Sequence, residues 1–93
     1  MGLALMFEWS EKKALLNFRK HGVSFDQART AFLDPLGVIY DDPEHSELEH
    51  REVLVGVSSR GRRLVVGFSE RGESIRIISA RKASKKERLH HEE

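Results

Sequence analysis

The stretch REVLVGVSSRGRRLVVGFSERGESIRIISA, residues 51–80, decides the fold. It divides into three runs rich in β-branched residues and two glycine-bearing turns, in the order 51–58, SRGR, 62–69, ERGE and 74–80. Short apolar runs separated by such turns are typical of consecutive antiparallel strands. Adjacent apolar residues, such as Val65 and Val66, point to opposite faces of a strand. The stretch therefore predicts an antiparallel sheet that is covered on much of both faces.

Two short amphipathic helices are expected before this sheet. The first spans residues 11–21, because Ser10 is a suitable N-cap and Gly22 can take the left-handed conformation that ends a helix. The second follows SFDQ, residues 24–27, which has the spacing of a capping box. It ends before the Asp–Pro pair at 34–35, since the residue before a proline avoids the helical conformation.

Three further segments complete the expected fold. MFEW at 6–9 and LGVIY at 36–40 have the composition of strands, and SKKE at 84–87 is a second capping box that opens a C-terminal helix. The order β-α-α-β-β-β-β-α predicts an α+β fold with a mainly antiparallel sheet of four to five strands. At this length we expect one domain, residues 1–93.

The composition favours a reducing compartment. None of the 93 residues is cysteine, so disulfides and thiolate metal sites contribute nothing. The opening MGLALMF lacks the cationic region of a signal peptide and is too short for a membrane helix. We therefore expect a cytoplasmic protein with no membrane partner.

The charges are unevenly distributed along the chain. The formal net charge is only +1. Residues 41–52, however, contain six carboxylates and one arginine, whereas residues 60–93 contain ten cations and five carboxylates. A basic third beside an acidic loop predicts a surface that attracts an anionic partner such as nucleic acid. The alternative is that these charges only solvate a small domain.

Metal and nucleophile chemistry find no support in the spacing. His45 and His50 lie five apart in the acidic loop, and the chain closes with two further histidines, but no pair has a helical i,i+4 ligand spacing. We therefore expect no metal and no cofactor. No cysteine is present, Ser24 and Ser84 are explained as helix caps, and the glycines do not form a phosphate loop.

The remaining candidates are the cations of the last strands and the tail: Arg71, Arg76, Arg81, Lys82, Lys85, Lys86 and Arg88. A guanidinium binds phosphate through paired, charge-assisted hydrogen bonds. The helix that opens at Ser84 would add free N–H groups close to Arg81.

Two of the candidate residues have an alternative structural role. Phe68 could stack on an RNA base, but it also fits the core of the sheet. Arg76 has apolar neighbours on both sides, so it needs either a function or a partner such as Glu70 or Glu73. For Arg71 the alternative is a place in the turn ERGE.

Three segments resemble one known family: FEWSEKKALLNFRKHGVSFDQA at 7–28, LDP at 33–35 and RIISARKASKKER at 76–88. They resemble BrnT-type toxins of bacterial type II toxin–antitoxin systems, over about residues 7–92. The resemblance implies a RelE-like fold and a ribonuclease that arrests growth by degrading RNA. It also implies a BrnA-type antitoxin, a ribbon-helix-helix DNA-binding protein. A dimeric antitoxin would give a heterotetramer that reaches operator DNA through the antitoxin.

The chain departs from this family near its end. The family commonly has a tyrosine in the final helix, and His91 aligns with it. An aromatic hydroxyl at this place can contribute to catalysis in RelE-like enzymes, and a histidine could replace it as an acid or base.

A metal-independent ribonuclease can use the 2′-OH of its substrate to attack the adjacent phosphate. The enzyme then supplies positive charge, positioning and acid–base help. Arg81 and Arg76 are the expected phosphate clamps, and Glu70 or His91 is the expected acid or base. His21 is a weaker candidate, because it also fits the cap at a helix C-terminus. Arg71, Lys82, Lys85 and Phe68 are expected to bind RNA.

One geometric condition limits this site. Arg76 and Arg81 are five residues apart, so in a regular strand they would point to opposite faces. They can converge only if the strand ends or bends near residues 79–80. Two functions therefore stay open: a ribonuclease toxin with an arginine-based site, and a non-catalytic binding module that acts in a toxin–antitoxin repressor complex.

Overall fold

A computed structural model describes residues 6–46 and 48–92, and side chains as far as residue 89. In chain order its elements are β1 (Met6–Glu8), α1 (Glu11–His21), α2 (Phe25–Ala31), β2 (Val38–Asp41), the 3-10 helix η1 (Pro43–His45), β3 (Glu52–Val57), β4 (Arg63–Arg71), β5 (Ser74–Lys82) and α3 (Lys85–Glu92). The α+β class is confirmed, with three α-helices and five strands in the described part of the chain.

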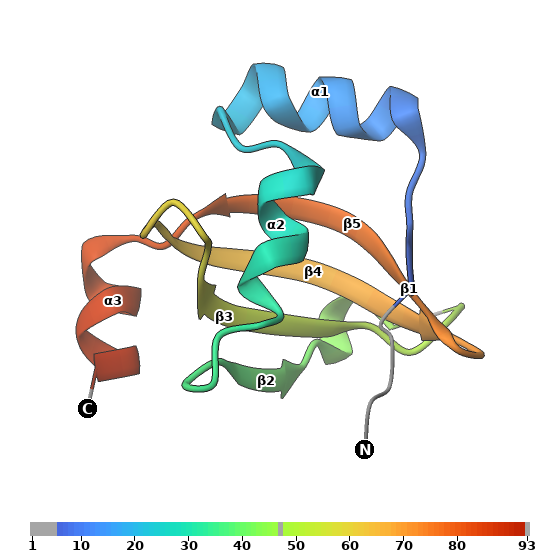
Figure 1. The fold of residues 1–93 in the computed structure, drawn as a ribbon. Coiled ribbons are helices and arrows are strands. Elements are labelled where there is room, and N and C mark those ends of the chain that lie inside the picture. The colour runs from blue at the N-terminus through green and yellow to red at the C-terminus, as the bar shows by residue number, and fades with distance from the viewer. Residues whose placement is uncertain (1–5, 47, 93) are drawn as a thin grey trace.

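The strands form one sheet in the order β1-β5-β4-β3-β2 (Figure 1). The pairs β2–β3, β3–β4 and β4–β5 are antiparallel, whereas β1 pairs with β5 in parallel. The sheet is therefore mixed. Two parallel strands cannot be joined by a tight turn and need a crossover connection. Here the connection from β1 to β5 contains both N-terminal helices and the three antiparallel strands β2, β3 and β4.

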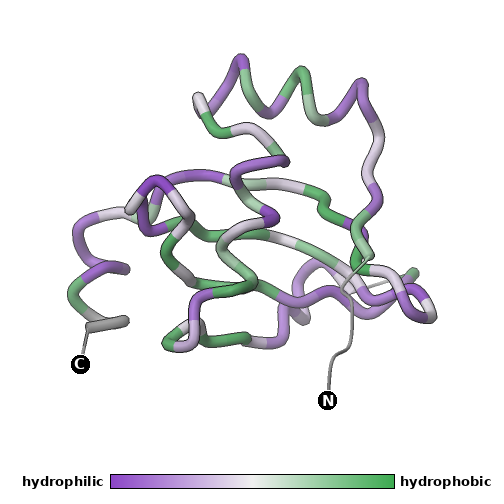
Figure 2. The backbone as a smooth tube through the Cα atoms, viewed as in Figure 1, coloured by the Kyte–Doolittle hydropathy of each residue, from purple (hydrophilic) through white to green (hydrophobic). Residues whose placement is uncertain are grey.

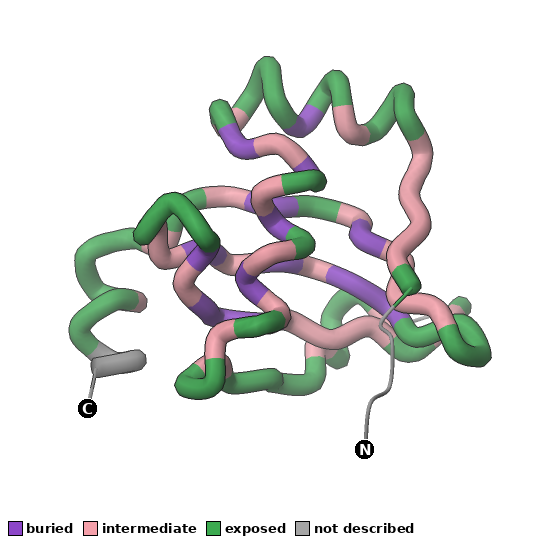
Figure 3. The backbone as a smooth tube through the Cα atoms, viewed as in Figure 1, coloured by how far each residue is buried: buried purple, intermediate pink, exposed green. Residues whose placement is uncertain are grey.

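Helices α1 and α2 lie over one face of the sheet, and the core lies between them and the strands (Figures 1 and 3). Phe25 and Ala28 of α2 pack with Leu64, Val66 and Phe68 of β4, and all five side chains are buried. Hydrophobic segments recur along the strands, α2 alternates between hydrophilic and hydrophobic segments, and α3 is mostly hydrophilic with one hydrophobic segment (Figure 2). Burial of this apolar surface is the main contribution to stability.

The opposite face of the sheet is less covered than the sequence suggested. The register places Tyr40, Val53 and Val65 on this face. Tyr40 is exposed, and the side chains of Val53 and Val65 are both half-buried. The expected cover of both faces is therefore only partial: Val55 on this face is buried, but α1 and α2 both lie on the other side.

Local hydrogen bonds explain where α1 and α2 begin and how α2 is attached to the sheet. The Ser10 hydroxyl accepts from the Lys13 N–H at 3.3 Å, and Gly22 ends α1 with φ 69°. The Ser24 hydroxyl accepts from the Gln27 N–H at 3.0 Å, but the Gln27 amide oxygen accepts from Ser58 instead of closing the capping box. Half of that capping box is therefore used to fix α2 to the end of β3.

None of the helices in the described ranges has the length and apolar composition needed to cross a lipid bilayer.

Candidate functional site

An irregularity in β5 decides where the two central arginines point. Gly67 pairs with Ser79 and Phe68 pairs with Ile77, so the strand gains one residue at Ile78. Such a β-bulge reverses the alternation of side chains beyond it. The bend that the sequence required is thus present, one residue before the expected position.

Because of the bulge, Arg76 and Arg81 lie on the same face. Arg76 pairs with Ser69 and Arg81 with Val65, and these partners are four residues apart on β4. Cross-strand partners share a face. That face is the one opposite α1 and α2, because the intervening Val66 and Phe68 point into the core.

A groove runs across this face beside Arg81. It consists of two adjoining hollows of about 450 and 460 Å³, which share Asp42, Val53, Val65 and Arg81. We call them together the open-face groove. Gly67 forms part of its floor, where an added Cβ would lie 2.7 Å from the Ser79 hydroxyl oxygen. A side chain at this position would therefore fill the groove and collide with Ser79.

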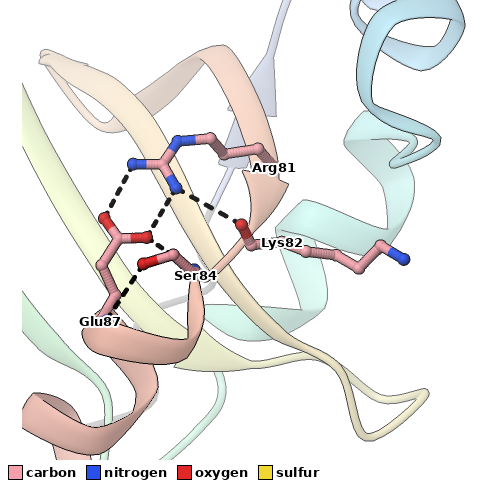
Figure 4. A network of polar contacts seen from close by, with 4 residues as sticks. All are labelled: Arg81, Lys82, Ser84 and Glu87. Atoms are coloured by element: carbon pink, nitrogen blue, oxygen red, sulfur yellow. Dashed lines mark hydrogen bonds and ion pairs between the residues drawn. The ribbon is translucent and has the colours of Figure 1, made fainter.

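Arg81 is held on one side of the groove by Glu87 of α3 (Figure 4). Its Nη1 donates to Glu87 Oε1 at 2.7 Å and its Nη2 to Oε2 at 2.8 Å, and Nη1 also reaches the Lys82 carbonyl at 3.4 Å. The hydrogen bonds from Arg81 lower the pKa of Glu87 from 4.5 to about 2, against the opposing effect of burial. The same contact raises the pKa of Arg81. The pair is therefore fully charged at neutral pH.

The start of α3 fixes the Glu87 carboxylate. The Ser84 N–H donates to Glu87 Oε1 at 2.8 Å, and the Glu87 N–H donates to the Ser84 hydroxyl at 3.1 Å. The capping box at 84–87 is thus confirmed. However, the Ser84 N–H that was expected to reinforce an anion site already has a partner.

One edge of the Arg81 guanidinium stays available. Glu87 occupies the edge formed by Nη1 and Nη2, while the Nε–H bonds to no described residue and points away from Glu87 (Figure 4). Nε and the second Nη2 proton form a fork of the geometry that a phosphate accepts. Arg81 can therefore bind an anion while Glu87 keeps its plane in place.

Asn17 of α1 anchors the strand next to Arg81. Its Nδ2 donates to the Ala80 carbonyl at 2.8 Å and to the Val23 carbonyl at 3.0 Å, and its Oδ1 accepts from the Ala80 N–H at 3.1 Å. Since β1 pairs with β5 only as far as Arg76, this buried amide replaces a strand partner. The sequence signal was a polar residue beside Ala14 and Phe18 on the apolar side of the helix, and sequence reasoning missed it.

Arg76 has a different environment. Its Nη1 donates at 3.1 Å to Oε2 of Glu8, its partner in the parallel register of β1. The expected partners Glu70 and Glu73 were therefore wrong. Five residues of strand also place Arg76 roughly 15 Å from Arg81, so the structure does not bring the two expected clamps together.

Glu70 and Arg71 lie at the other end of the sheet from Arg81. They pair with Ile75 and Ser74 beside the β4–β5 turn, and Arg71 forms an ion pair with Glu49 at 3.2 Å. Neither lines the open-face groove. Glu70 is therefore too remote to act as acid or base for a phosphate at Arg81.

Phe68 cannot stack on a base in this structure. Its side chain is 1% exposed and meets Phe32 edge-on at 5.0 Å between ring centroids. The core role is the one the structure supports, and the expected RNA contact is wrong.

The other residues that were expected in the site either do not line the groove or have side chains outside the described residues. Lys82 pairs with Leu64 and so lies on the other face from Arg81. Lys82 and Lys85 both line a separate hollow beside the β3–β4 turn. The side chain of His91 lies outside the described residues.

Sequence reasoning also missed a histidine–aspartate pair in the groove. His45 Nδ1 lies 2.9 Å from Asp42 Oδ2, and both residues line the groove with Arg81. Such a contact orients the ring and leaves Nε2 as the ring nitrogen that Asp42 does not occupy. His21, at the end of α1, lines the same hollow. The signal for the pair was the i,i+3 spacing of Asp42 and His45 around Pro43, which starts η1.

Among the side chains that the structure describes, one group could hold a metal ion. Asp41, His50 and Glu52 bring one ligand atom each within 4.8 Å of one another, with His50 Nε2 3.2 Å from Asp41 Oδ1. The pairing of Asp41 with Glu52 across β2 and β3 assembles them, which spacing along the chain did not reveal. Asp41 and His50 are exposed, and His50 does not line the open-face groove.

One comparison with known proteins shows the family, and another shows a similar fold. The family model described as the ribonuclease toxin BrnT of type II toxin–antitoxin systems matches residues 9–87. Among solved structures, the chain is similar to the crystal structure of the Brucella abortus ribonuclease toxin BrnT, with a TM-score of 0.67 and 21% identity over 88% of this chain and 100% of that chain. A search of the curated proteins found no match. The RelE-like architecture stays a prediction.

Proposed function

The chain belongs to the BrnT family of ribonuclease toxins of type II toxin–antitoxin systems, and from this premise we propose that it is a metal-independent endoribonuclease that cleaves RNA in the open-face groove and so arrests growth. One observation carries the proposal: Arg81 is held rigidly by Glu87 while the Nε edge of its guanidinium bonds to no described residue beside the groove.

Arg81 binds the scissile phosphate. Its Nε–H and the free Nη2–H donate to two non-bridging oxygens, and the guanidinium stabilises the additional negative charge of the transition state. Because arginine stays protonated, Arg81 cannot serve as the base. Glu87 acts as a positioning residue: it holds the guanidinium plane and does not touch the substrate.

His45 and His21 supply the acid–base chemistry. Neutral His45, oriented by Asp42, takes the proton of the 2′-OH through Nε2. The 2′ oxygen forms a bond to phosphorus, the bond to the 5′ oxygen breaks, and protonated His21 gives the leaving oxygen its proton. The products are a 2′,3′-cyclic phosphate and a 5′-hydroxyl end. In this proposal His45 replaces Glu70, while a part for His91 stays a prediction.

The substrate contributes its own nucleophile, so the reaction needs no metal-bound water. Asp41, His50 and Glu52, the group of described residues that could hold a cation, have no part in the proposed steps. Cleavage takes place in the cytoplasm. The partner is an antitoxin, as expected for a type II system, and we propose a BrnA-type protein whose dimer gives a heterotetramer and carries the complex to operator DNA.

The test is to induce the wild-type protein without an antitoxin and to follow growth and RNA integrity. Growth should stop, and the purified protein should cleave RNA in the presence of EDTA to products with cyclic phosphate ends. Intact RNA from a folded, antitoxin-free preparation would contradict the proposal. That outcome would favour the alternative of a non-catalytic partner in a repressor complex.

A further inference from the structure

A second hollow lies on the other side of α3 from Arg81. It has a volume of about 520 Å³ and opens between the β3–β4 turn, the end of β5 and α3. The cations that line it are Arg62, Arg63, Lys82, Lys85 and Arg88. No carboxylate among the described side chains, which end at residue 89, lines this hollow. We call it the basic pocket.

Helix α3 separates the basic pocket from the open-face groove. Lys85, Arg88 and Leu89, which have the i, i+3 and i+4 spacing of one helix face, line the pocket. Lys86 and Glu87 instead line the groove. The two sites are therefore about one helix diameter apart, roughly 10 Å.

Three of the cations that line the basic pocket differ from the arginines elsewhere on the sheet. Arg71 and Arg81 each bind a carboxylate. Lys82, Lys85 and Arg88 form no ion pair with any described residue, and all three are exposed. Like charges that converge on one hollow repel each other and concentrate a positive potential there. An incoming anion relieves this repulsion.

The groove has the opposite balance. Asp41, Asp42, Glu52 and Glu87 line it together with Arg81, Arg51 and Lys86. Because its carboxylates balance its cations, the groove as a whole attracts a polyanion only weakly, although Arg81 is placed to bind one phosphate. A polyanionic strand would gain most of its electrostatic affinity beyond α3.

We propose that the basic pocket is a second phosphate subsite, which binds the backbone of the substrate RNA at a nucleotide that flanks the one held by Arg81. This inference rests on the proposed function, because it assumes that the ligand is RNA. The Lys and Arg side chains come from a turn, a strand end and a helix, so they surround a backbone phosphate without reading a base. The subsite therefore adds affinity that is independent of sequence and sensitive to salt.

The experiment measures binding of a labelled, 2′-O-methylated RNA of about ten nucleotides, which cannot be cleaved, over a series of salt concentrations. The double variant Lys82→Ala/Arg88→Ala removes two pocket charges. The matched control Lys12→Ala/Lys13→Ala removes two exposed charges from the start of α1, away from both sites. Circular dichroism verifies that each variant is folded.

The pocket variant should bind about tenfold more weakly at low salt, and its slope of log K against log salt should be shallower by about 1.4. The control should match the wild type. With a cleavable RNA, KM should rise more than kcat falls. Lys82→Arg/Arg88→Lys should restore binding, because phosphate contact here needs charge more than one exact geometry.

The outcome separates this proposal from the proposed function. If the pocket variant binds like the wild type, or if the control loses as much, the phosphate subsite is refuted even when the wild type cleaves RNA. If the wild type binds the oligonucleotide through Lys82 and Arg88 but never cleaves RNA, the subsite stands and the catalytic proposal fails. Loss of antitoxin binding with unchanged RNA binding would make the pocket a protein-docking site and would overturn the inference.

Discussion

Arg76 and Arg81 lie on the same strand and the same face, and each binds a glutamate, but their surroundings differ and we propose different roles for them. The partner of Arg76 is on β1, a strand fixed to β5 by backbone hydrogen bonds, and the Arg76 side chain is only 25% exposed. The partner of Arg81 is on α3, whose described side chains include no buried residue, and Arg81 is 43% exposed beside a groove. The ion pair alone therefore does not distinguish the two arginines. The element that carries the glutamate does, and on this basis we propose a structural role for Arg76 and a functional one for Arg81.

The largest effect on RNA cleavage should come from the substitution of Arg81. Arg81→Ala removes the phosphate clamp, so RNA cleavage should fall by about 10² to 10³, the usual cost of losing one such transition-state donor. Arg76→Ala is the matched control and should cleave within a few-fold of wild type. Cleavage rates with EDTA present, together with thermal unfolding, check both. An equal loss in the two variants would erase the distinction between them.

The next effect concerns His45, which lines the same hollow as Arg81. His45→Ala removes the proposed base and should lower kcat by about a hundredfold. His50→Ala is matched to it, because His50 comes from the same acidic segment and also contacts an aspartate, at 3.2 Å, but does not line the groove. It should retain cleavage. Single-turnover rates are the measurement, and a His45→Ala enzyme as fast as wild type would exclude this base.

A smaller effect should appear in stability as a function of pH. The folded-state pKa of Glu87 is about 2, below its usual 4.5, so the Arg81 contact stabilises the fold above pH 4.5 and loses its effect as pH falls through 2. Both side chains are partly exposed, which limits the contribution to about 1 kcal/mol. Glu87→Gln should therefore unfold more easily than wild type at pH 6, with a difference that shrinks towards pH 2. A difference that is constant with pH would point to lost packing instead.

The smallest effect should come from the structural pair. Glu8→Gln removes the charge that faces Arg76 and should lower the free energy of unfolding by about 0.5 kcal/mol, typical of a partly exposed pair. RNA cleavage should stay at the wild-type rate. Urea unfolding and cleavage assays on the same preparation test this, and reduced cleavage would return Arg76 to the active site.

The sequence was sufficient for features that depend on nearby residues. The glycine-bearing turns and apolar runs predicted the antiparallel strands, and the capping box at 84–87 appears with both of its hydrogen bonds. Arg81 could be singled out because it stands near the end of the last strand, three residues before that box. These signals are local, so no knowledge of the register was needed.

The remaining features depend on contacts between distant segments. The bulge at Ile78, which puts Arg76 and Arg81 on one face, follows from the β4–β5 register and has no local signature. Glu8 meets Arg76 across 68 positions of sequence, and Asn17 meets Ala80 across 63. His45 looked like a solvated loop residue because η1 brings it to the groove only in the folded chain.

Arg81 and Arg76 can also be compared directly in solution. The central claim is that Arg81 binds phosphate through its Nε edge while Glu87 holds the other edge, and the guanidinium Nε–H signals of ¹⁵N-labelled protein report on that edge. Addition of a 2′-O-methylated RNA, which binds but is not cleaved, should shift the Arg81 Nε–H signal and leave the Arg76 signal unchanged. An Arg81 signal that does not move while the RNA is bound would contradict the account.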